Sequence, residues 1–236
     1  MTYNPSTASK SQKNQLLSHM STIYYYPYLP NQNIEQHPLF DLMYDLETIN
    51  PPHTEYKSTM SSCPAMQVQQ THTYLLRSPI DFTVTYNHQS KSWSSPPTTQ
   101  EISEMLMPEQ DRQPYLQLAT YYLFWTEKQS NTQLWMHDVP LHEVNDTPSW
   151  YIASGMFPVG TYTRNTSLGL ILKPNYNKIK VERGQPLAAI TLIDNEKVKL
   201  IKKKPPQHII DANIRNHGKS KYCPFLAAKT LFSRWM

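Results

Sequence analysis

Two histidine–carboxylate pairs carry residue types that bind metals. His137-Asp138 and His142-Glu143 stand five residues apart around Pro140, and imidazoles with carboxylates can hold zinc or non-haem iron. Residues at i and i+5 lie on opposite faces of a strand, so the spacing does not direct both pairs at one ion. The pattern therefore favours surface loop residues over a metal centre, and neither a metal nor a cofactor is predicted.

A lysine cluster is the second candidate for chemistry, and it comprises Lys197, Lys199 and the run Lys202-Lys203-Lys204. Along a strand, the first two lysines share one face, opposite Val198 and Leu200. Such lysines protect the edge of a sheet against pairing with another chain. They also suit phosphate groups, and Arg215, Lys219 and Lys221 could extend the patch. Edge protection is the favoured interpretation, and anion or nucleic-acid contact stays open.

The charge distribution separates a body from a basic C-terminal block. Residues 196–236 hold ten Lys and Arg against two acidic residues, whereas residues 1–195 hold 12 against 16. This asymmetry is typical of a surface that meets a polyanion or an acidic partner. A solvated basic tail explains it as well.

Motifs for nucleophilic or nucleotide chemistry are missing from the sequence. Cys63 and Cys223 each precede a proline and have no neighbouring histidine, and no Gly-x-Ser-x-Gly elbow occurs. The five glycines all lie between Gly155 and Gly218, which argues against a glycine-rich phosphate loop. An enzymatic function is therefore less expected than a binding function.

The compartment is read from the cysteines and the N-terminus. Two distant cysteines form no disulfide framework and fit a reducing cytoplasm. Residues 1–20 lack the apolar core of an export signal, and no apolar run approaches membrane-spanning length. We therefore expect a protein without an export signal and without a membrane partner.

The elements that must position these residues centre on Pro158–Lys204. This stretch alternates apolar runs with a Pro-Asn-Tyr-Asn turn and an Arg183-Gly184 turn, which predicts several strands at the centre of one sheet. Further strands are expected at 73–77, 80–86 and 150–154. The domain organisation that follows is a polar arm over 1–20, a β-rich domain over 21–204 and a basic helical segment over 205–236.

One hairpin and several helices complete the expected elements. The aromatic strands 120–126 and 132–137 flank a five-residue loop, which is the pattern of a β-hairpin. Helical spacing predicts short helices over 38–47, from 100 to Pro108, over 208–216 and over 225–235. The predicted fold class is therefore mainly β (α+β), with a mixed or antiparallel sheet and two short C-terminal helices.

Two family resemblances rest on these residues. Arg164-Asn165, the segment Val181-Glu182-Arg183-Gly184-Gln185-Pro186-Leu187 and the upstream Leu75-Leu76-Arg77-Ser78-Pro79 resemble uncharacterised proteins of tailed phages and cyanobacteria, over roughly Thr73 to Trp235. That resemblance implies no known activity.

More distantly, residues 164–193 are similar to the β-clip of dUTPases and dCTP deaminases. The resemblance implies that Arg77 and Ser78 lie near a phosphate, with Arg164 at the start of the motif. No aspartate upstream of Arg164 matches the one that positions the attacking water, and the glycine-rich C-terminal arm is missing. At most, the β-clip resemblance implies ligand binding without catalysis.

The expected function is that of a non-enzymatic phage-type protein that acts through protein–protein surfaces, as a virion or assembly component. Its partners would be other protein subunits, in a homo-oligomer or a virion, with nucleic acid or an acidic surface as a further partner of the basic block. It would lie in the virion or the host cytoplasm. Alternatives are a nucleotide-binding or nucleotide-hydrolysing β-clip protein and an inhibitor of a host protein.

Overall fold

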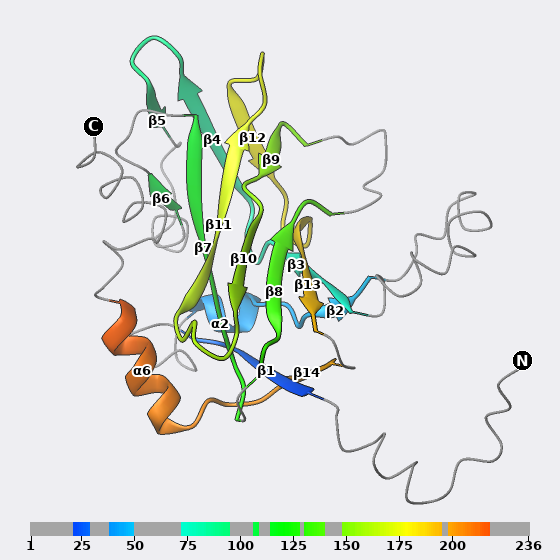
Figure 1. Ribbon diagram of the computed structural model, residues 1–236. Coiled ribbons are helices and arrows are strands. Elements are labelled where there is room, and N and C mark those ends of the chain that lie inside the picture. Colours follow the sequence, from blue (N-terminus) through cyan, green and yellow to red (C-terminus); the bar gives the residue numbers. More distant parts are fainter. Residues whose placement is uncertain are drawn as a thin grey trace, which may run out of the picture.

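A computed structural model shows a mainly β protein, which confirms the predicted fold class. The described part of the chain forms three sheets and two short helices around a shared core (Figure 1). The structure describes residues 21–28, 38–49, 72–94, 106–108, 114–127, 130–139, 148–194 and 198–217. The predicted polar arm over 1–20, the expected helix over 225–235, Lys197, Lys219, Lys221 and both cysteines lie outside these residues.

The large sheet has the order β14-β1-β7-β11-β9, and β6 also pairs with β7. Its strands are β1 (Ser21–Pro27), β6 (Leu106–Pro108), β7 (Tyr115–Trp125), β9 (Trp150–Ile152), β11 (Asn165–Leu172) and β14 (Val198–Lys202). Since β1 and β14 are parallel and the other pairs are antiparallel, the sheet is mixed.

Two smaller sheets complete the fold. The five-stranded second sheet has the order β10-β8-β13-β3-β2, and the three-stranded small sheet has the order β12-β4-β5. The second sheet contains β2 (Glu47–Thr48), β3 (Thr73–Arg77), β8 (Gln133–His137), β10 (Gly155–Pro158) and β13 (Pro186–Ile193). The small sheet contains β4 (Phe82–Asn87), β5 (Ser92–Ser94) and β12 (Lys178–Val181).

All three sheets contribute to one cluster of buried apolar side chains. Alternate residues of each strand enter it, as in Leu168 and Leu170 of β11 and Phe82 and Val84 of β4, because successive side chains of a strand point to opposite faces. The small sheet lies at the upper end of the molecule in Figure 1, and α6 lies at the lower end. Binding surfaces at these two ends are therefore separate.

The expected hairpin between 120–126 and 132–137 is wrong, although both strands exist. β7 pairs with β1, β6 and β11 in the large sheet, while β8 pairs with β10 and β13 in the second sheet. Both edges of each strand are thus taken by other partners. Thr132, just before β8, is fully buried, and its hydroxyl donates a hydrogen bond to the Asp194 carboxylate.

The Pro158–Lys204 stretch does not form the centre of one sheet as expected. β11 and β14 belong to the large sheet, β12 to the small sheet and β13 to the second sheet. Each strand finds partners that are distant in sequence, as in the pairing of β13 with β3 and β8. The stretch instead connects all three sheets.

Two helix predictions also need correction. The helix expected over 38–47 is only α2 (Pro38–Leu42), because main-chain groups after Leu42 form hydrogen bonds with tyrosine hydroxyls. Tyr122 donates to the carbonyl of Tyr44, and Tyr25 accepts from the amide of Leu46 at 3.2 Å. Leu106–Pro108, expected at the end of a helix, is strand β6. The helix expected over 208–216 is confirmed as α6 (Gln207–His217).

Candidate functional site

The Arg77-Ser78 pair meets the Arg183-Gly184 turn, so the structure brings together the two motifs behind the β-clip resemblance. The Arg77 guanidinium Nη1 donates to the carbonyl of Gly184 at 2.9 Å. The main chain of Ser78 accepts from Gly184 at 2.8 Å and donates to the Gln185 carbonyl at 3.0 Å. We call these residues the turn junction.

The turn junction holds its own polar groups rather than leaving them open to an anion. Ser78 is fully buried, and its hydroxyl donates to the Ile80 carbonyl at 2.6 Å. The amide of Arg183 donates to the Asp81 carboxylate at 2.8 Å. Gly184 has φ of +82°, a left-handed conformation that favours glycine. Ser78 therefore fixes the turn, and the guanidinium of Arg77 is the group that remains suited to an anionic ligand.

Arg164 lies next to a different sheet from the one that contains Arg77. It immediately precedes β11 of the large sheet, with its guanidinium 5.4 Å from the centroid of the Tyr162 ring, whereas Arg77 ends β3 of the second sheet. Its neighbour Asn165 has a clear structural role. The Asn165 amide donates to the carbonyls of Tyr28 and Tyr121, and its oxygen accepts from Asn213 of α6.

Lys199 and Lys202 lie on β14 at the edge of the large sheet, and Lys203 and Lys204 directly follow it, as the edge-protection interpretation expects. Lys202 pairs with Asp45 and Lys203 with Glu127, each at 2.5 Å. The Lys203 ammonium also lies 4.6 Å from the centroid of the Tyr24 ring, and its hydrogen bond lowers the pKa of Glu127. Lys199 and Lys204 are exposed. The block thus fastens β14 to neighbouring elements, and its contact with an anion stays a prediction.

His137 belongs to a buried hydrogen-bonded chain. Its Nδ1 lies 2.7 Å from the carbonyl of Asp138 and therefore carries the proton, so Nε2 accepts from the Thr191 hydroxyl at 2.8 Å. Thr191 in turn lies 2.7 Å from Thr73. Both ring nitrogens are engaged, and in the part of the chain that the structure describes no group of three or more His, Cys, Asp or Glu could hold a metal. His142 and Glu143 lie outside that part.

Acid is expected to destabilise the fold through His137. Burial lowers the pKa of this imidazole below its ordinary 6.5. Below about pH 6.5 the unfolded chain binds a proton that the folded chain resists, so stability is complete above that pH and falls as the pH drops towards the folded pKa. Urea unfolding between about pH 7 and pH 5 should show this decline. In His137→Gln the decline should be shallower, and an unchanged slope would assign it to other groups.

The large sheet carries an exposed apolar patch that the sequence did not indicate. Tyr151 of β9 and Ile171 of β11 are register partners and are 49% and 37% exposed. Both residues belong to apolar runs of the sequence that predict buried side chains, and they are exposed because of the way their strands face. The Lys173 ammonium lies 4.8 Å from the Tyr151 ring centroid, and the Asp138 carboxylate accepts from the amide of Ile152 at 2.8 Å. We call Tyr151 and Ile171 the edge patch.

No protein-family model matches this chain. No curated protein matches it either. Among the described residues, no helix is long and apolar enough to cross a membrane.

Proposed function

We propose that this chain is a non-enzymatic, phage-type protein that acts through protein–protein contacts, as a component of a virion or of its assembly. The edge patch is the observation that carries the proposal. It places an aromatic and a β-branched side chain side by side at the margin of the large sheet, where both are substantially exposed. Aromatic side chains are enriched in protein interfaces, where burial of apolar area stabilises association.

A second copy of this chain is the partner that the edge patch fits. Two hydrogen bonds flank Tyr151. The main-chain amide of Lys173 donates to the carbonyl of Ser149, and the amide of Ile152 donates to the Asp138 carboxylate. Lys173 and Asp138 thus provide opposite charges beside the edge patch, and these can pair across a contact between two copies. Such a contact is self-complementary in charge, as a two-fold interface requires.

The polar side chains that could serve catalysis already form hydrogen bonds or ion pairs within the fold, which supports a binding role over an enzymatic one. The Ser78 hydroxyl closes a turn, the His137 ring bridges two strands, and the Lys203 ammonium holds Glu127. Each is satisfied by protein partners in the described part of the chain. A reaction centre would need such groups directed at a substrate.

Light scattering of the full chain after size-exclusion chromatography tests the proposal. Wild-type protein is expected to elute as a dimer or larger assembly, and Tyr151→Ser/Ile171→Ser as a monomer. Ile214→Ser is the matched control, because Ile214 on α6 is exposed to a similar degree, 42%. It should leave the mass unchanged. A monomeric wild-type protein at micromolar concentration would rule out self-association through the edge patch.

A nucleotide-binding protein is the second candidate, favoured by the turn junction. Arg77 and the Arg183-Gly184 turn lie together there, as the β-clip resemblance implies. Thermal unfolding with added nucleoside triphosphates tests this candidate. A rise in melting temperature of several degrees that Arg77→Ala abolishes would support it over the assembly role. No shift with any of the four common triphosphates would reject it.

A further inference from the structure

Two turns and a strand start meet at the upper end of the molecule and form a connected surface. His88 after β4 contacts the carbonyl of Tyr176 through Nε2 at 3.1 Å, and the Ser149 hydroxyl donates to the carbonyl of Lys178 at 2.7 Å. The amide of Lys173 donates to the carbonyl of Ser149 at 2.9 Å. We call His88, Lys91, Lys173, Tyr176 and Lys178 the distal tip.

The turns of the distal tip are held by local hydrogen bonds. The Asn87 side chain accepts from the amides of Gln89 and Ser90 at 2.9 and 3.0 Å. The second turn closes from Tyr176 to the Lys173 carbonyl at 3.2 Å, with Asn175 in the left-handed conformation. Side chains on these turns are therefore presented from a fixed backbone, which lowers the entropic cost of binding.

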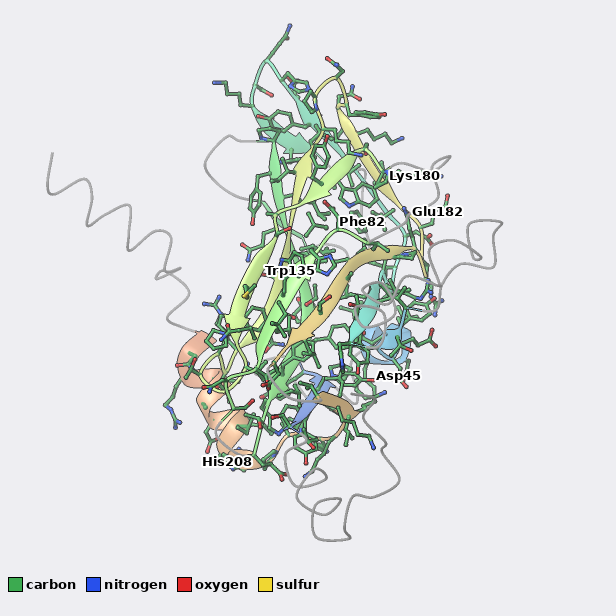
Figure 2. All side chains as sticks on the ribbon, turned by 45° about the vertical axis from the view of Figure 1, so that its right-hand side comes forward. Asp45, Phe82, Trp135, Lys180, Glu182 and His208 are labelled. Carbon is green, nitrogen blue, oxygen red and sulfur yellow. The ribbon has the colours of Figure 1, made fainter. Side chains whose placement is uncertain are left out.

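The five residues of the distal tip include three lysines and no carboxylate, and the Asp138 carboxylate contacts the neighbouring Ile152 amide. Residues 82–94, 114–118, 148–152 and 169–181 contain four lysines and no aspartate or glutamate. Lys180 of β12 pairs at 2.8 Å with Glu182, which directly follows that strand (Figure 2). Lys91 and Lys178 are exposed, and Lys173 is half-buried. This end differs from the C-terminal block, where Lys202 and Lys203 are paired with carboxylates.

Aromatic rings accompany these lysines. The Tyr176 side chain, between Lys173 and Lys178 in sequence, is 47% exposed. The neighbouring Tyr151 ring is 49% exposed and lies beside the Lys173 ammonium. Lysines that contact phosphates and rings that stack on bases are the two elements of single-strand nucleic-acid binding. Base stacking on a ring held by a fixed turn is the feature that favours single-stranded nucleic acid as the occupant.

We propose that the distal tip binds single-stranded nucleic acid, with Lys91, Lys173 and Lys178 on backbone phosphates and Tyr176 stacked on a base. Three phosphate contacts give a slope of log affinity against log salt of about −2 for a single strand. Raising the salt from about 50 to 200 mM should therefore weaken binding roughly 15- to 20-fold. Lys173 also takes part in the proposed contact between copies. Lys91, Lys178 and Tyr176 lie outside the edge patch, so variants of these three residues test nucleic-acid binding separately from self-association.

Fluorescence anisotropy of a labelled oligothymidylate of roughly 20 nucleotides with the full chain tests this assignment. Lys91→Gln/Lys178→Gln should weaken binding and reduce the salt slope by about 1.4, and Tyr176→Ser should weaken binding about five-fold or more. Lys199→Gln/Arg215→Gln removes two exposed cations of the C-terminal block and should weaken binding less than the tip variant, which separates binding at the tip from binding at that block.

Three outcomes would overturn the assignment. They are no binding of the oligonucleotide at low salt, equal losses in the two double variants, and unchanged affinity in Tyr176→Ser. Polyglutamate and vesicles containing phosphatidylserine serve as competitors. If either displaces the oligonucleotide at equal charge concentration, the surface recognises negative charge alone and not nucleic acid.

Discussion

Asn165→Leu is expected to lower the free energy of unfolding by about 3–5 kcal/mol, since it leaves several polar groups without partners at once. β7 contains a bulge at Tyr121, whose φ of +56° interrupts its register with β11. The Asn165 amide donates to the carbonyl of Tyr121 at 3.2 Å and to that of Tyr28. Its oxygen also accepts from the fully buried Asn213 at 2.7 Å. Urea denaturation measures the loss.

Ser167→Ala is the matched control for Asn165. Ser167 lies two residues further along the same face of β11 and accepts one hydrogen bond, from Gln117 at 2.6 Å. Its removal should cost only about 0.5–1.5 kcal/mol. Amide exchange should also accelerate in α6 of Asn165→Leu and not in Ser167→Ala, because Asn213 ties that helix to β11. Equal losses in both variants would show that Asn165 is an ordinary strand residue.

Thr191→Val should cost about 1–3 kcal/mol, although the two side chains have nearly the same shape. The Thr191 hydroxyl connects β8, β13 and β3 by its contacts with His137 at 2.8 Å and Thr73 at 2.7 Å. Valine leaves the buried Nε2 of His137 without its donor. Thermal and urea unfolding at neutral pH measure the effect.

Thr85→Val provides the comparison, because Thr85 lies on the half-buried face of β4. That substitution should change the free energy of unfolding by at most about 0.5 kcal/mol. A similar small change in Thr191→Val would mean that water replaces the hydroxyl in the chain from His137 to Thr73.

Strand positions were predictable from the sequence because apolar alternation is a local property. The strands expected at 73–77 and 80–86 correspond to β3 (Thr73–Arg77) and β4 (Phe82–Asn87). Partner choice was not predictable, since it depends on which edges remain open after the other strands have paired. The separation of β7 from β8 into two sheets is the clearest case.

The residues of the candidate sites were also predictable only in part. The sequence singled out Arg77, Ser78 and the Arg183-Gly184 turn, and the structure joins them. It also singled out Lys203, whose partner Glu127 lies 76 positions away and could not be anticipated. The edge patch and the distal tip carried no local signal, because they depend on which strand faces turn outward and which turns meet.

Disulfide trapping tests the self-association of this chain most directly. In a background with Cys63 and Cys223 replaced by serine, Tyr151→Cys places one thiol in the edge patch. Mild oxidation should then produce a covalent dimer of twice the monomer mass, because cysteines can bridge when their Cα atoms approach to within about 7 Å. Ile214→Cys, on α6, should form no covalent dimer under the same oxidation. Failure of Tyr151→Cys to cross-link, or equal cross-linking by both variants, would contradict the edge patch as the contact between copies.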